Sequence, residues 1–226
     1  MWHCKRPARI GIFTLVYLSG VALFFLKGAT LPCKAAYPAA WLAAVLFAAG
    51  QKPCRPTAWA LLLSAAGDAA GAQHLFLLQI AFFAAAHVAY IRYFLPAAQY
   101  SGRRILGAAV IGGGLLLFGL LRLLPRVGMP AERFGVALYA VVIAAMLAST
   151  FLYRGRFAAG FRCAALLFVL SDSMIGWNRF VEPLPDADPL VMGTYYAAQY
   201  LFALLALLNG TEDSARSAPR HPTGET

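Results

Sequence analysis

Long apolar stretches alternate with short polar breaks along almost the whole chain. Eight apolar segments can be counted, at residues 10–26, 35–49, 57–71, 75–95, 105–124, 134–153, 163–180 and 189–208. Most approach the roughly 20 apolar residues that a helix needs to cross about 30 Å of hydrocarbon. In lipid the backbone groups must be satisfied within each segment, so the stretches are predicted to be helices. The pattern predicts an all-α, polytopic membrane protein with a bundle of about eight transmembrane helices.

The breaks between the segments are too short to hold a soluble domain. They carry turn and charged residues, such as Pro32-Cys33-Lys34 and Ser101-Gly102-Arg103-Arg104. Segments 35–49 and 57–71 have only about 15 clearly apolar residues each, which is short for a full crossing and leaves a count of seven as an alternative. We expect a single transmembrane domain over residues 1–210 and a disordered polar tail over 211–226.

Composition agrees with a lipid environment. Hydrophobic residues make up 61% of the chain and charged residues 12%, too few charges to cover a soluble surface. Lys5, Arg6 and Arg9 precede the first apolar segment as they would in a signal peptide. That segment is longer than the apolar part of a signal peptide and has no good cleavage site, so we expect a transmembrane helix. The 4 cysteines show no CxxC spacing and are expected to be structural.

The positive charge predicts orientation rather than a nucleic-acid partner. The net charge is +10, but Lys and Arg stand singly or in pairs at the ends of apolar runs instead of forming a basic stripe. Across eight spans, thirteen of the 19 basic residues fall on the side of the termini and six on the other. The positive-inside rule then places both termini in the cytoplasm. Compact loops without a targeting signal favour a bacterial cytoplasmic (inner) membrane.

Two acidic residues, Asp68 and Asp172, lie inside the predicted spans, whereas the other seven lie in loops or in the tail. An ionisable residue at depth is costly and is a functional candidate; a carboxylate that only joins helices is the alternative. Counted from Arg55 and Arg162 at 1.5 Å per residue, the two acids lie about 20 Å and 15 Å from the inner edge, in a similar layer. If their helices are neighbours, burial and mutual repulsion favour one protonated acid beside one carboxylate.

Other polar side chains gather around these acids. Ser64 precedes Asp68 by one helical turn, and Ser171 and Ser173 flank Asp172. The fourth and eighth segments add His87, Tyr90, Tyr195, Tyr196 and Gln199. Lone Ser and Tyr residues commonly join helices by hydrogen bonds, and His74 is expected at the membrane interface. Because no HxxxH, HxxE or GxSxG pattern is present, we expect neither a metal site nor a serine nucleophile.

The residues around the two acids resemble a known family. The stretch LLLSAAGD at 61–68, followed by FFAAAHVAYIRYF at 82–94, resembles the central signature of the lysoplasmalogenase, or YhhN-like, family. ALLFVLSDS at 165–173 is a second match. A third is Lys34 at the start of the second segment, where the family has Lys-Pro and this chain has Ala35. The matches occur in the right order over most of the chain.

The resemblance implies an eight-helix hydrolase that cleaves the vinyl ether bond of lysoplasmalogens to a fatty aldehyde and glycerophosphoethanolamine or glycerophosphocholine. Vinyl ethers yield to acid, because protonation of the alkenyl β-carbon gives an oxocarbenium ion to which water adds. Asp68 and Asp172 are expected to be catalytic, with the acid role open between them and no metal or cofactor needed. Its partners would be the lysophospholipid substrate and membrane lipid.

Second-rank candidates would hold this substrate. We expect Lys34 and Arg179, near the outer face, to meet the lipid phosphate, although Arg179 could equally be an interfacial residue. The remaining substrate-binding candidates are His87, Tyr90, Tyr195, Gln199, Ser64 and Ser171.

Two other function classes fit the same residues. In a proton-coupled lipid carrier or transporter, Asp68 and Asp172 would relay protons. Each of them falls on the third span of its half, which hints at a parallel repeat. A metal-dependent intramembrane lipid amidase is the third possibility.

Overall fold

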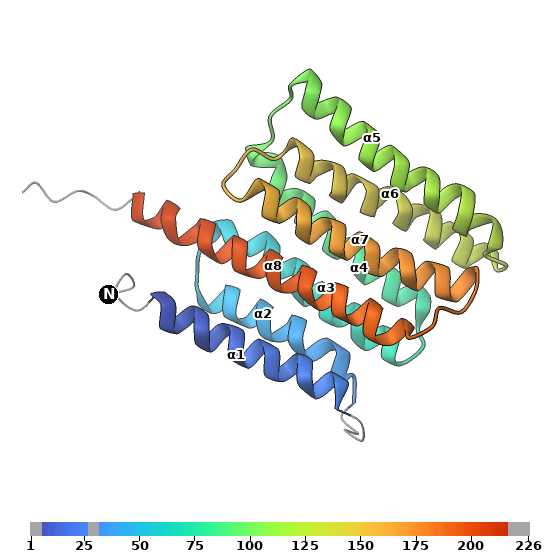
Figure 1. Ribbon diagram of the computed structural model, residues 1–226, viewed down its shortest axis with the longest axis horizontal. Helices are drawn as coiled ribbons and strands as arrows, with labels where there is room; N and C mark the ends of the chain where they lie inside the picture. Colours follow the sequence, from blue (N-terminus) through green and yellow to red (C-terminus); the bar gives the residue numbers. More distant parts are fainter. Residues whose placement is uncertain (1–5, 27–31, 217–226) are drawn as a thin grey trace, which may run out of the picture.

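The structure is a computed structural model that describes residues 6–26 and 32–216, with side chains described for 10–26 and 32–210. In this part of the chain eight α-helices form one bundle without a strand, and successive helices run in opposite directions (Figure 1). The helices are α1 (Arg6–Phe25), α2 (Tyr37–Ala48), α3 (Arg55–Ala72), α4 (Phe76–Phe94), α5 (Gly102–Phe118), α6 (Pro130–Leu152), α7 (Ala158–Phe180) and α8 (Ala187–Arg216).

Five of these helices, α4 to α8, are long and apolar enough to cross a membrane. The apolar parts of α1 and of α2 with its preceding turn, Ile10–Phe25 and Lys34–Ala48, are shorter. Many large apolar side chains point outward, among them Leu106, Val110 and Phe134, as expected where lipid is the solvent. The chain is therefore an integral, multi-pass membrane protein, and the prediction of an all-helical bundle is confirmed.

Local sequence explains where several helices begin and end. Pro38, Pro56 and Pro130 occupy the first or second position of α2, α3 and α6, where a missing N–H costs nothing. Gly50, with φ of 67°, follows the end of α2 in the left-handed conformation that commonly terminates helices. Helix α8 continues to Arg216, past the predicted domain boundary at residue 210. Residues 217–226 of the predicted disordered tail lie outside the described part, as do Cys4, Lys5 and Lys27.

The order of packing separates the two helices that carry the acids. Helix α3 packs against α2, α4 and α8, whereas α7 packs against α6 and α8. Small residues bring α3 close to α4: a Cβ on Gly67 would lie 3.0 Å from the ring of Phe83. A space therefore separates α3 from α7, and α4 and α8 border this space as well as α3.

The two ends of the bundle are filled differently. We call the end where α1 begins and α8 ends the terminal end (Figure 1), and the opposite end the cavity end. Toward the terminal end lies an aromatic core in which the rings of Tyr90 and Phe202 stack 4.2 Å apart. Phe94 and Phe161 meet with centroids 5.3 Å apart, and all four side chains are fully buried. This core fixes the spacing of α4, α7 and α8.

Candidate active site

A cavity of about 710 Å³ occupies the cavity end of the bundle. The last turns of α3 and α7, the first turns of α4 and α8 and the turn before α2 form its wall. Asp68 and Asp172 both line it, so the structure brings together the two acids that the sequence places at similar depth. The polar residues of the lining are Lys34, Asp68, Gln79, Ser171, Asp172, Asn178, Arg179, Asp188 and Tyr195.

Asp68 is held by a tyrosine from α8. The hydroxyl of Tyr195 donates a hydrogen bond of 2.7 Å to Asp68 Oδ2, and only 8% of Asp68 is exposed. The ring of Tyr195 is fixed in turn by edge contacts with Phe83 and Phe168, at centroid distances of 5.9 and 5.3 Å. A rigid donor of this kind orients the carboxyl group toward the cavity.

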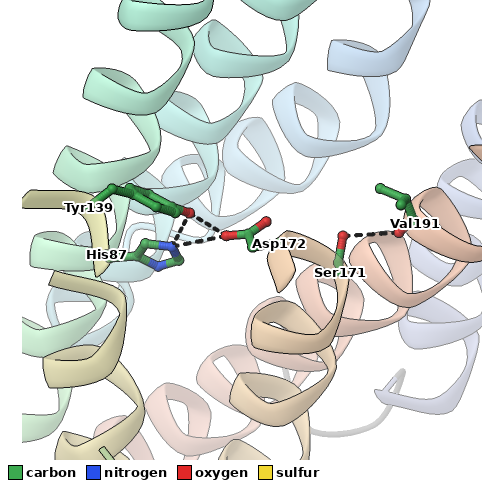
Figure 2. Close-up of polar contacts among 5 residues, drawn as sticks. All are labelled: His87, Tyr139, Ser171, Asp172 and Val191. Atoms are coloured by element: carbon green, nitrogen blue, oxygen red, sulfur yellow. Dashed lines mark hydrogen bonds and ion pairs between the residues drawn. The ribbon is translucent and has the colours of Figure 1, made fainter. Parts of the chain in front are cut away.

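Asp172 is held by residues from two other helices. Its Oδ2 accepts a hydrogen bond from the hydroxyl of Tyr139 on α6, and the same oxygen lies 3.6 Å from His87 Nε2 on α4 (Figure 2). His87 Nε2 and the Tyr139 hydroxyl are 2.9 Å apart. His87 is fully buried, whereas the Asp172 side chain is 10% exposed to the cavity. Asp172 therefore ends a polar chain that runs from α4 through α6 to α7.

Ser171 turns away from this chain. Its hydroxyl donates a hydrogen bond of 3.0 Å to the carbonyl oxygen of Val191, on the opposite side of α7 from Tyr139 (Figure 2). The contact joins α7 to the first turns of α8. Two successive residues of α7 therefore have different roles: Ser171 joins α7 to α8, and Asp172 contacts Tyr139 and His87.

The cavity lining includes two basic residues, Arg179 and Lys34. Arg179 Nη2 lies 3.1 Å from Glu132 Oε1, and its guanidinium is 4.0 Å from the ring centroid of Phe76. Lys34 Nζ lies 5.5 Å from the ring centroid of Phe24. Both residues line the cavity, and their contact with a lipid phosphate stays a prediction.

Four predicted residues lie outside the cavity lining. Ser64, His87, Tyr90 and Gln199 are all fully buried. The Ser64 hydroxyl, the Tyr90 hydroxyl and the Gln199 amide find no hydrogen-bond partner among the described residues. Ser64 and Gln199 each lie one helical turn from the Asp68 and Tyr195 pair, toward the terminal end. Buried polar atoms of this kind are the places where a structure accommodates internal water.

Sequence reasoning missed Tyr139 and Gln79. Tyr139 is the single polar residue in the apolar stretch 134–148 of α6, and no pattern distinguishes it from a lipid-facing tyrosine. Gln79 lines the cavity from the first turn of α4, beside Gly71. His74 is exposed in the turn between α3 and α4, in agreement with an interfacial position. In the described part of the chain, no three His, Cys, Asp or Glu side chains gather closely enough to share a metal ion.

Comparison with known proteins identifies curated relatives over 64 to 74% of this chain. The pig lysoplasmalogenase TMEM86B (Sus scrofa) is 40% identical over 148 residues, which cover 64% of this chain and 60% of the pig protein. The human lysoplasmalogenase TMEM86B is 38% identical over 66% of this chain and 62% of its own length, and the rat protein is 33% identical over 74% and 69%. The chain thus spans roughly three fifths of the pig and human relatives that it matches.

No solved structure matches the chain. The model of the YhhN family matches residues 10–206, which include both acids, all the cavity-lining residues and the greater part of every helix. The chain belongs to the YhhN family.

Proposed function

We propose that this protein is a membrane-embedded hydrolase that cleaves the vinyl ether bond of lysoplasmalogens. The products would be a fatty aldehyde and a glycerophospho-base. The relatives in pig, human and rat are named lysoplasmalogenases, which supports this substrate class. The observation that carries the proposal is that Asp68 and Asp172, from two separate helices, line one cavity in a protein with very few other intramembrane charges.

The reaction needs a proton donor and a proton acceptor, and two carboxyl groups supply both. One protonated carboxyl transfers its proton to the alkenyl β-carbon, and the ether oxygen shares the positive charge of the resulting oxocarbenium ion. The other group, as a carboxylate, stabilises this cation and takes a proton from the water whose oxygen adds to the adjacent carbon. Neither step requires a metal or an organic cofactor.

The same two groups complete the second half of the reaction. The hemiacetal loses the proton of its hydroxyl to the carboxylate that was formed in the first step. The glycerol oxygen takes a proton from the other carboxyl as its bond to the former alkenyl carbon breaks. Aldehyde and glycerophospho-base leave, and both acids return to their starting states. Tyr195 and Tyr139 hold the two carboxyl groups in position throughout.

The membrane placement follows from the charges. We propose that all eight helices cross the bilayer as one domain over residues 1–210, with both termini in the cytoplasm, because the sequence assigns thirteen of its 19 basic residues to the side of the termini. The compact loops suggest that the cell is bacterial. The cavity end would then face the outer leaflet, from which a lysolipid enters. A reporter that is active only outside the cytoplasm, fused after Gly210, should stay silent. A strong signal would overturn this topology.

Product analysis with purified protein tests the function directly. We expect release of fatty aldehyde from alkenyl lysophospholipids and none from alkyl or acyl lysolipids with the same headgroup, because only the vinyl ether is labile to proton transfer to carbon. Release of fatty acid from the acyl lipid, or no cleavage of any alkenyl lipid, would contradict the proposal. Activity of the purified enzyme in detergent, without a membrane gradient, also distinguishes it from a proton-coupled carrier.

A further inference from the structure

A narrow apolar slot lies next to the cavity, at Asp172. It has a volume of about 80 Å³ and lies between α4, α6, α7 and the π-helical turn Gly119–Leu123 that follows α5. The wall of the slot includes the side chains of Ile80, Leu123, Val136 and Phe180. Its chemistry therefore differs from that of the cavity, whose lining carries acids, amides and cations.

The slot and the cavity share part of their wall. Phe76, Gln79, Phe83, Asp172 and Ile175 line both spaces. The slot therefore adjoins the cavity, and Asp172 lies at the boundary between a polar and an apolar compartment.

Close contacts set the width of the slot. The π-helical turn directs Leu123 into the bundle, where it is 9% exposed. On the facing helix, a Cβ on Gly176 would lie only 2.8 Å from Leu123 Cδ1, so any larger residue would push Leu123 into the slot. On the outer side, Ile80 is only partly buried and its neighbour Leu77 is 46% exposed. The slot thus lies directly beneath the lipid-facing surface of α4.

We propose that this slot binds the first methylene groups of the substrate's alkenyl chain, an inference that rests on the proposed function. A lysoplasmalogen joins a charged headgroup to a hydrocarbon chain at the bond that reacts. The cavity offers cations and polar groups to the headgroup, and the slot, whose wall is mainly apolar, offers room for hydrocarbon. A substrate that uses both compartments has its reacting bond at their junction, beside Asp172, and the rest of its chain continues past Ile80 into lipid.

Filling the slot should change chain-length preference. For substrates supplied as monomers in water, each methylene that the slot buries should raise kcat/KM by about fourfold, so the wild-type protein should prefer longer alkenyl chains to a propenyl chain. The substitution Val136→Phe places a ring in the slot and should lower kcat/KM for long-chain substrates by about tenfold or more, which corresponds to about two methylene groups. Activity on the propenyl compound should remain. A matched control is Leu138→Phe on the same helix, since Leu138 is 52% exposed to lipid and should tolerate the ring.

A second variant narrows the slot from the facing wall. Gly176→Ala moves only the flexible end of Leu123, so the fold should be retained, and long-chain turnover should fall by a few-fold. Gly113→Ala is its control, because no atom lies within 4 Å of a Cβ at Gly113. Equal losses on long and propenyl substrates, or no loss in both slot variants, would overturn the proposal.

A binding experiment separates the slot from the reaction. A non-cleavable alkyl lysophospholipid with a diazirine close to its ether oxygen is bound to the purified protein and irradiated, and the labelled peptides are identified by mass spectrometry. We expect labels on α6 and α7 around Val136 and Gly176, which Val136→Phe should remove and Leu138→Phe should retain. Labels elsewhere, such as on α1 or α2, would refute the slot even if the protein is a lysoplasmalogenase. If the slot is labelled but the purified protein cleaves no alkenyl lipid, the proposed function is refuted and the slot is not.

Discussion

The cavity end and the terminal end of the bundle are built from the same helices but are filled differently. Helix α4 contributes Tyr90 and Phe94 to the aromatic core, yet one to two turns earlier it contributes His87 and Phe83 to the site. Helix α8 likewise contributes Phe202 at one end and Tyr195 at the other. The core holds the helices at fixed separations, so that they can remain apart around a cavity. Substitutions at the two ends should therefore have separable effects on turnover and on stability.

The largest effect is expected at the two acids. Asp68→Asn and Asp172→Asn keep the shape of the side chain but remove proton donation and negative charge. Since general acid catalysis contributes about 10²- to 10⁴-fold, each variant should lose at least about a hundredfold in turnover, with little change in thermal stability in detergent. The double variant should lose little more than the worse single variant, because the two groups act as one unit. Near-normal turnover in either variant would remove that residue from the mechanism.

In the aromatic core, a substitution is expected to lower stability and to leave turnover nearly unchanged. Phe202→Ala removes a fully buried ring that stacks on Tyr90 and should cost about 3 kcal/mol or more in stability. Turnover per folded molecule should stay near normal well below the unfolding temperature. Thermal unfolding in detergent and an assay at low temperature measure the two quantities. The control is Leu170→Ala on α7, whose side chain is 49% exposed to lipid and should unfold almost as the wild type does. A large loss of turnover in folded Phe202→Ala would show that the two ends are not separable.

A smaller effect is expected at the tyrosine that holds Asp172. Tyr139→Phe removes one hydrogen bond to the carboxyl group. Hydrogen bonds to charged groups contribute about 1.5 to 3 kcal/mol, so turnover should fall by roughly ten- to a hundredfold. Tyr100→Phe, at a position that is 67% exposed, should have no effect. Unchanged turnover in Tyr139→Phe would mean that Asp172 is positioned without this hydrogen bond.

The cation at the cavity lining should affect binding more than chemistry. Lys34→Gln removes a charge that can meet the substrate phosphate, and a partly solvated ion pair contributes at most about 1 kcal/mol, or about fivefold in KM. The value of kcat should be unchanged, and the dependence of KM on salt should weaken. Lys52→Gln, at an exposed position near the terminal end, is the control. An equal change in both variants would indicate a general effect of net charge.

The sequence predicts the helices, and it singles out the two acids that the structure places in one cavity, for the same physical reason. Lipid excludes charges and unpaired backbone groups, so an apolar run predicts a helix, and Asp68 or Asp172 within such a run is conspicuous. Tyr139 could not be predicted, because its importance depends on α6 lying beside α4 and α7, which no local pattern encodes. The same limit applies to the slot, whose walls come from four separate segments. Ser64, Tyr90 and Gln199 are substrate-binding candidates from the sequence, but the structure places them fully buried and outside the cavity lining, which no sequence position reveals. Their role in binding stays a prediction.

Removal of metal ions is expected to have no effect on turnover. This experiment tests whether the acids at the cavity end catalyse the reaction without a metal. In the described part of the chain, His87 and Asp172 are two possible ligands without a third nearby, and a catalytic zinc needs three protein ligands. Treatment of the purified protein with a strong chelator should therefore leave aldehyde release unchanged. The control is a zinc hydrolase that loses its activity under the same conditions. Loss of turnover that zinc alone restores would instead favour a metallohydrolase with His87 and Asp172 as ligands, and both acids would then need new roles.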